Sequence, residues 1–69
     1  MNNGMNEYLE FTISCDDTVK EHLIAEMAEA DYEGFIELEN GFSAFIQQPK
    51  FNQIEFENLL NKYLSLIHI

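Results

Sequence analysis

The residues best suited to chemistry in this chain of 69 residues are two histidines, one cysteine and thirteen carboxylates. His22 and Glu26 are four residues apart, so on a helix both side chains could reach one metal ion. A structural metal site normally needs about four ligands, and no further set of ligands converges on this pair. We therefore interpret them as surface residues and expect no metal site. The competing interpretation is a small metal-binding protein that uses His22, His68 and carboxylates.

Cys15 is the only cysteine, which excludes an intrachain disulfide. It ends an alternating apolar stretch and no basic residue adjoins it, so we expect a packed, inert thiol. The sequence has no glycine-rich phosphate or dinucleotide loop, no HExxH and no serine nucleophile elbow. Among so many carboxylates some will lie close together by chance. We therefore assign no catalytic residue and no cofactor-binding residue in this chain.

Charge and length restrict the possible partners and location. The formal net charge is −10, from thirteen acidic and three basic residues. Such a surface repels phosphate backbones and anionic lipids, so we expect no direct binding of nucleic acid or membrane, whereas a basic partner is favoured. No basic start leads into an apolar segment, and the apolar C-terminal stretch is too short to span a bilayer. These features predict one small, soluble, cytoplasmic domain.

The first elements that must position these residues are a strand and a helix. Period-two alternation predicts a half-buried strand with Leu9, Phe11, Ile13 and Cys15 on one side. Asp16-Asp17-Thr18 is rich in N-cap residues, and Thr18 has capping-box spacing to Glu21. Asp31 is expected to end the helix, because Asp tolerates the left-handed backbone. The predicted buried stripe is Val19, Leu23, Met27 and Ala30, with Lys20, Glu21, Glu26 and Glu29 mostly outside it.

A hairpin is predicted around Asn40-Gly41. A two-residue type I′ turn there would place Glu37 and Glu39 on the same face as Phe42. A three-residue loop, with Gly41 left-handed in a G1 bulge, leaves one face wholly apolar. That register pairs Leu38 with Phe42, Ile36 with Ala44 and Gly34 with Ile46. Because a slip of one residue inverts the faces of a strand, we expect the second register.

The other face of this hairpin is the candidate protein-docking face. In the expected register it carries Phe35, Glu37, Ser43, Phe45 and Gln47, with Phe35 and Phe45 directly paired. Exposed aromatic residues among acidic groups can mark a docking surface, although single exposed apolar residues are also normal. Two alternatives stay open: a second domain covers this face, or the aromatic residues only stabilise a cross-strand pair.

A second helix follows Pro49, which cannot donate a ladder hydrogen bond and stops the strand. Asn52 is the expected N-cap, and Phe51 and Phe56 have the spacing of a hydrophobic staple. The predicted buried stripe is Phe56, Leu59, Leu60 and Tyr63. The order β-α-β-β-α predicts an α+β fold, a ferredoxin-like (split βαβ) two-layer sandwich, with the fourth strand missing or replaced by the tail.

The last six residues, Leu64-Ser65-Leu66-Ile67-His68-Ile69, match the in-frame translation of the transposon-end adapter used in sequencing libraries. We interpret residues 64–69 as a non-native tail and residues 1–63 as the native part, cut inside or just after the second helix. The alternative is an ordinary apolar helix end or a fourth strand.

Several stretches together resemble the N-terminal domain of ribosomal protein L11 methyltransferases of the Bacteroidetes type, from about Glu7 to Tyr63. They are Tyr8-Leu9-Glu10-Phe11, residues 23–29, Tyr32-Glu33-Gly34-Phe35, Glu39-Asn40-Gly41-Phe42 and Ala44-Phe45-Ile46. One departure is Asp31, where relatives often have glycine. The other is the missing fourth strand.

The resemblance implies a fragment of an S-adenosylmethionine-dependent protein methyltransferase. In that family a small ferredoxin-like domain recognises the ribosomal protein, and a larger domain binds the cofactor and methylates lysine and N-terminal amines. The cofactor glycines and the catalytic residues belong to the larger domain, so none maps onto this chain. The implied partner is a basic ribosomal protein, and the oligomeric state is open. The alternative is a stand-alone ferredoxin-like regulatory or adaptor module.

Overall fold

The computed structural model describes residues 7–64 of the chain. The elements are β1 (Tyr8–Ser14), α1 (Asp17–Glu29), β2 (Gly34–Leu38), β3 (Gly41–Gln47), a short 3₁₀ turn (Gln48–Lys50) and α2 (Gln53–Leu64). This order confirms the predicted β-α-β-β-α sequence of elements. The prediction of a non-native tail falls almost wholly on residues 65–69, which lie outside the described residues.

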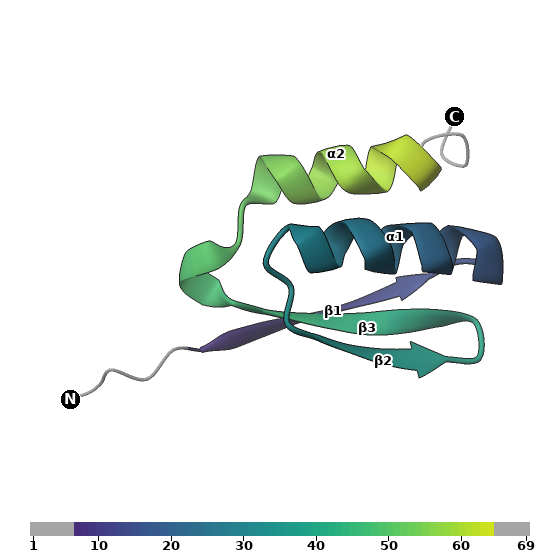
Figure 1. The fold of residues 1–69 in the computed structure, drawn as a ribbon, viewed down its shortest axis with the longest axis horizontal. Coiled ribbons are helices and arrows are strands. Elements are labelled where there is room, and N and C mark those ends of the chain that lie inside the picture. Colours follow the sequence, from purple (N-terminus) through teal and green to yellow (C-terminus); the bar gives the residue numbers. More distant parts are fainter. Residues whose placement is uncertain (1–6, 65–69) are drawn as a thin grey trace.

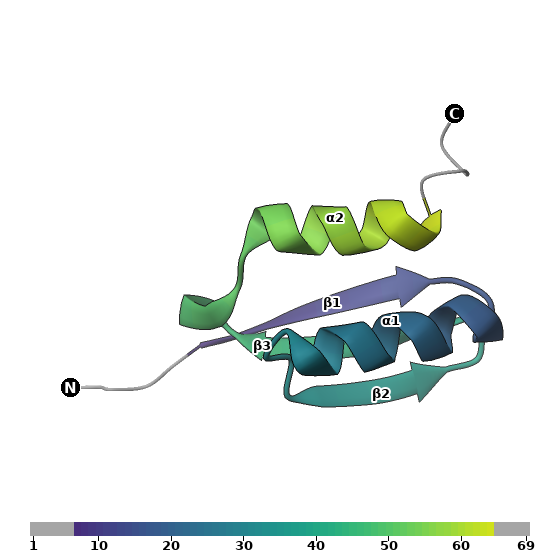
Figure 2. The ribbon, with the colours of Figure 1, turned by 45° about the horizontal axis from the view of Figure 1, so that its top comes forward.

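The three strands form one sheet in the order β1-β3-β2, and β3 is antiparallel to both neighbours. β1 and β2 therefore run in the same direction with β3 between them, which is the split βαβ arrangement. Both helices lie on one face of the sheet and leave the other face open (Figures 1 and 2). The predicted α+β, two-layer, ferredoxin-like class is confirmed for the described part of the chain. No helix within residues 7–64 is both long and apolar enough to cross a membrane.

The core lies between α1 and the helix-facing side of the sheet. Its buried apolar members come mainly from α1 and the central strand: Ile13, Leu23, Met27, Tyr32, Phe42, Ala44 and Ile46. Each large apolar side chain buried in this way contributes roughly 1.5–3 kcal/mol of transfer free energy. β3 has a neighbour on both sides and a helix above it, and this position explains why it holds three of these seven apolar core residues.

The helix ends follow local chemistry. Asp16 is the N-cap of α1, because its Oδ1 accepts a hydrogen bond of 2.9 Å from the backbone N–H of Val19. Asp31 has a φ of +77°, which confirms it as the left-handed residue after the helix. At α2 the Oδ1 of Asn52 accepts from the N–H of Glu55 at 2.9 Å, so the predicted cap is confirmed.

The hairpin register differs from both of the registers that the sequence suggested. Leu38 pairs with Gly41 and Phe35 pairs with Ala44, so Glu39 and Asn40 alone form the loop. Gly41 has a φ of +158° and belongs to β3 rather than to a left-handed bulge. The expectation of one wholly apolar face was therefore wrong for β2.

The hairpin adopts this register because Gly41 packs against β1. It lies opposite Ser14, and a Cβ on it would stand 2.0 Å from the carbonyl oxygen of Ile13. Only a residue without a side chain fits there, so the glycine is used for this close approach instead of for a turn. Phe42 and Ile46 face the core as expected. Ile36 and Leu38 do not, and they are 53% and 42% exposed.

Candidate functional site

The structure divides the predicted docking residues between the two faces of the sheet. Ser43, Phe45 and Gln47 alternate with the core residues of β3 and lie on the open face. Phe35 and Glu37 lie on the helix side, where the ring of Phe35 is 6.4 Å from that of Phe42. The predicted direct pair of Phe35 with Phe45 is wrong, because a shift of one residue in β2 inverts its faces.

The open face is a mixture of polar and apolar side chains. The side chains on it are Tyr8, Glu10, Thr12 and Ser14 from β1, Ile36 and Leu38 from β2, and Ser43, Phe45 and Gln47 from β3. At its centre the hydroxyls of Thr12 and Ser43 are hydrogen-bonded at 2.8 Å. Phe45 lies beside Gly34, where an added Cβ would be 3.8 Å from the ring. Sequence reasoning assigned Ile36 and Leu38 to the core and so missed them here.

Glu33 organises one end of this face. Its carboxylate accepts hydrogen bonds from the Tyr8 hydroxyl at 2.7 Å and from the Gln47 side-chain amide at 2.6 Å. The Lys50 ammonium lies 3.8 Å from the same carboxylate. The hydrogen bond to Glu33 raises the pKa of the Tyr8 phenol, because it favours the protonated form. These contacts link β1, the end of β3 and the segment before β2 at this end of the face.

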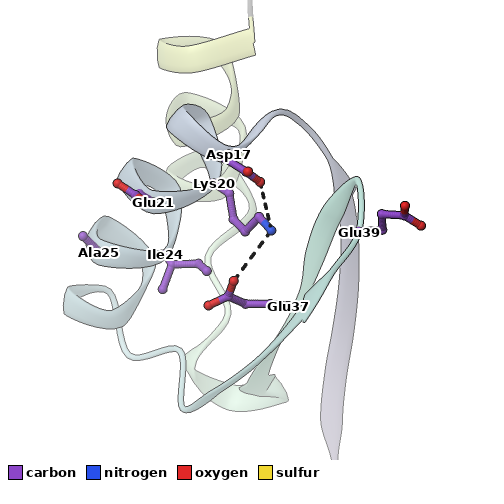
Figure 3. A pocket seen from close by; sticks show the side chains of 7 residues that line it. All are labelled: Asp17, Lys20, Glu21, Ile24, Ala25, Glu37 and Glu39. Carbon is purple, nitrogen blue, oxygen red and sulfur yellow. Dashed lines mark ion pairs between the residues drawn. The ribbon is translucent and has the colours of Figure 1, made fainter.

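A groove of about 620 Å³ lies between α1 and β2, on the helix side of the sheet (Figure 3). Its lining residues come from α1 and from the β2 end of the hairpin: Asp17, Lys20, Glu21, Ile24, Ala25, Glu37 and Glu39. Figure 3 shows Glu37 directed from β2 towards α1, and Glu39 directed away from the groove. The lining has an apolar part, Ile24 and Ala25, among carboxylates.

Lys20 is the buried cation of this groove. It is only 7% exposed, although the sequence analysis placed it mostly outside the buried stripe. Its ammonium donates to the Leu38 carbonyl oxygen at 3.1 Å and lies 3.3 Å from Asp17 and 3.7 Å from Glu37. The spacing to Leu23 and Met27, three and seven residues on, was the signal that places it on the same helix face.

A second polar cluster links the two helices. The carboxylate of Glu26 in α1 accepts hydrogen bonds from Lys62, at 3.0 Å, and from the hydroxyl of Tyr63 in α2. The Tyr63 hydroxyl first and Lys62 second lower the pKa of Glu26. The same contacts with Glu26 raise the pKa values of Tyr63 and Lys62. Glu26 is thus engaged with α2 rather than free on the surface.

His22 and Cys15, the two other candidates for chemistry, are both packed against neighbouring groups. The imidazole of His22 stacks on the ring of Tyr63, with centroids 5.6 Å apart. Cys15 is half-buried, and burial followed by the charge of Asp16 raises the pKa of its thiol, as suits the inert thiol expected from the sequence. Within residues 7–64 no three His, Cys, Asp or Glu side chains are grouped so that they could hold a metal ion.

Comparison with known proteins gives partial matches. Over 50 residues the chain is 42% identical to proteins named "Ribosomal protein L11 methyltransferase" from two strains of Bacteroides fragilis, and the match covers 68% of this chain and 18% of each relative. Over 60 residues it is 35% identical to a protein of the same name from Bacteroides thetaiotaomicron, which covers 83% of this chain and 21% of that relative. No protein-family model matches the chain. No solved structure matches it either.

These matches confirm the resemblance for the part of the chain that they cover. The chain spans about a fifth of the length of the curated relatives it matches. The names of the relatives support a relationship to a methyltransferase family for the part of the chain that is matched.

Proposed function

We propose that this chain is the protein-recognition part of an S-adenosylmethionine-dependent methyltransferase that modifies ribosomal protein L11. The observation that carries the proposal is the similarity to proteins of that name in Bacteroides. Because the chain spans only about a fifth of those relatives, cofactor binding and methyl transfer are assigned to a part of the enzyme outside this chain. The proposed location is the cytoplasm, where ribosomal proteins are made.

Electrostatics support a basic protein as the partner. The formal net charge is −10, and each of the three lysines is already within 4 Å of a carboxylate. The surface that a partner meets is therefore dominated by unmatched negative charge. Complementary charge speeds the encounter with a basic protein and disfavours acidic partners. Ribosomal proteins that bind RNA need positive charge, so they meet this requirement.

Calorimetry with purified ribosomal protein L11 and with S-adenosylmethionine tests this proposal. The chain is expected to bind the ribosomal protein at low salt, to bind it more weakly at physiological salt, and to give no binding heat with the cofactor. An unrelated basic protein of similar net charge is the control for unspecific attraction. Tight binding of S-adenosylmethionine, or equal binding of both basic proteins, would contradict the proposal.

The proposed domain organisation is a recognition domain at residues 1–63 followed by a non-native tail at residues 64–69. Reading the genomic DNA beyond the codon of Tyr63 tests it directly. An open frame that continues into a glycine-rich strand–helix segment supports the methyltransferase. A stop codon directly after Ile69 would instead support the alternative, a stand-alone regulatory or adaptor module.

A further inference from the structure

β2 has an unpaired outer edge in the part of the chain that the structure describes. The strand order is β1-β3-β2, so β2 (Gly34–Leu38) pairs with β3 on one side only. An edge strand presents backbone N–H and C=O groups that can pair with another extended segment. β1 forms the opposite edge of the sheet. What distinguishes β2 is the chemistry on its two sides.

On the helix side, the groove of about 620 Å³ runs between α1 and β2 (Figure 3). Of its four acidic lining residues, Glu39 is directed away, which leaves Asp17, Glu21 and Glu37, and the buried ammonium of Lys20 is the one cation among the lining residues. Lys20 already contacts Asp17 and Glu37, and Glu21 has no ion-pair partner within residues 7–64. The groove therefore carries an excess of negative charge beside an apolar patch.

On the open side, Ile36 and Leu38 form an exposed apolar pair on β2. They are 53% and 42% exposed, and they are two of the four large hydrophobic residues exposed in the described chain. Successive side chains of a strand point to opposite faces of a sheet. A strand added to β2 would therefore place alternate side chains beside the groove and beside Ile36 and Leu38.

We propose that the edge of β2 binds an extended segment in which lysine or arginine alternates with apolar residues. Its cationic side chains enter the groove near Glu21 and Glu37, and its apolar side chains cover Ile36 and Leu38. Main-chain hydrogen bonds to the edge supply affinity, and the alternating side chains supply specificity. The inference rests on the proposed function for the source of this segment, which is the basic protein substrate.

Charge decides between this occupant and a second copy of the chain. Pairing two copies along β2 would bring together two molecules that each carry a formal charge of −10, and it would place the carboxylates of both grooves close to each other. Like charges in one interface oppose association. A cationic segment is instead attracted by these carboxylates, so it is the more favourable partner for the edge of β2.

Nuclear magnetic resonance of the ¹⁵N-labelled chain tests the edge with defined peptides. The first peptide is Lys-Val-Lys-Val-Lys-Val with blocked ends, and the matched control has the same composition in the order Lys-Lys-Lys-Val-Val-Val. The alternating peptide is expected to shift the amide signals of β2 and of residues 17–25, and to bind more tightly than the control. Shifts confined to α2 or to β1, or equal binding of both peptides, would overturn the inference.

Two pairs of variants separate local from overall charge. Glu21→Gln with Glu37→Gln is expected to weaken the alternating peptide about tenfold, because both groups border the binding edge. Glu29→Gln with Glu57→Gln makes the same change of net charge away from the groove, and it should weaken binding less than about twofold. Equal weakening by the two pairs would contradict a site at β2.

Ile36→Ser with Leu38→Ser tests the apolar side and is expected to weaken binding several-fold.

Ribosomal protein L11 in the same assay distinguishes this inference from the proposed function. If the alternating peptide binds at β2 but the ribosomal protein does not bind, the edge site stands and the proposed function fails. If the ribosomal protein binds without shifting the amides of β2, the function stands and the edge site fails. Signals of β2 that change with protein concentration alone would assign the edge to a second copy and overturn the inference.

Discussion

The two helices lie on the same face of the sheet but are held in different ways. α1 completely buries Leu23 and Met27 against the core. α2 has no buried residue among its described side chains, and its apolar stripe is only partly covered. It contacts the sheet through aromatic rings, with Phe56 4.4 Å from Phe11 of β1. One helix is held by apolar burial, and the other by ring contacts and polar links.

The difference follows from the strands that the helices contact. α1 packs beside β3, the central strand, whereas the ring contact that α2 makes with the sheet is from Phe56 to Phe11 of β1, an edge strand in the described sheet. An edge offers fewer neighbours to a helix above it, so less apolar surface is removed from water. The link from Glu26 to Lys62 and Tyr63 then supports α2. We expect the position of α2, but not that of α1, to depend on pH.

Matched Leu→Ala substitutions give the largest expected contrast. Leu23→Ala should lower the free energy of unfolding by about 3 kcal/mol, because it leaves a cavity in a fully buried place. Leu60→Ala removes the same atoms from the half-buried stripe of α2 and should cost about 1 kcal/mol. Urea denaturation followed by circular dichroism measures both values. Equal losses would contradict the difference between the helices.

The aromatic contacts of α2 give the next largest effect. Phe56→Ala removes the ring that contacts both Phe11 and Phe51, and we expect a loss of about 2 kcal/mol. Amide hydrogen exchange should become faster in α2 than in α1, because the substitution loosens one helix and leaves the buried face of the other in place. Equal acceleration in both helices would show that they unfold as one unit.

Alkaline titration distinguishes Tyr32, which is buried in the core beside α1, from Tyr63 on the more exposed α2. Burial first, and Glu55 second, raise the pKa of Tyr32 to about 12, whereas Tyr63 owes its raised pKa first to its hydrogen bond with Glu26. Both groups stabilise the fold fully below pH 10, and this stabilisation is lost as the pH rises through their folded pKa values. Absorbance at about 295 nm should show Tyr32 ionising last, and Tyr32→Phe should remove that phase. In Glu26→Gln, Tyr63 should ionise earlier while Tyr32 is unchanged.

Acid should give the smallest effect and act on α2 alone. The pKa of Glu26 is lowered in the folded state, so its contribution is present above the ordinary value of 4.5 and is lost as the pH falls through the folded pKa. Hydrogen exchange in α2 should therefore accelerate below that value. In Glu26→Gln it should already be faster at neutral pH and should change less with acid. Glu29→Gln, an exposed change in the same helix, is the control and should behave like the parent chain.

The local features of the fold could be predicted from the sequence. The alternation of Leu9, Phe11 and Ile13 gave the inner side of β1, and Asn52 with Phe51 and Phe56 gave the start of α2. Strand alternation and helix capping depend on residues only a few positions apart, so the local sequence is enough to predict them. This is why the order of the elements and the fold class were correct.

The register of the hairpin could not be predicted in the same way. A search for one wholly apolar face ignored that β2 is an edge strand, where exposed Ile36 and Leu38 are tolerated. It also ignored the approach of Gly41 to Ile13, which depends on a contact between segments about 28 residues apart. The groove was missed for a related reason, since Lys20 was classified by its charge and not by its helical position.

The close approach of Gly41 to β1 has a consequence for searching genomes. Any side chain at that position would collide with the main chain of the neighbouring strand, whereas Glu39 and Asn40 are exposed in the loop. Chains that share this fold should therefore keep glycine at the equivalent place while the two preceding residues vary. An alignment of many such chains would reveal it as an invariant column, and it could serve as a marker where overall identity is low.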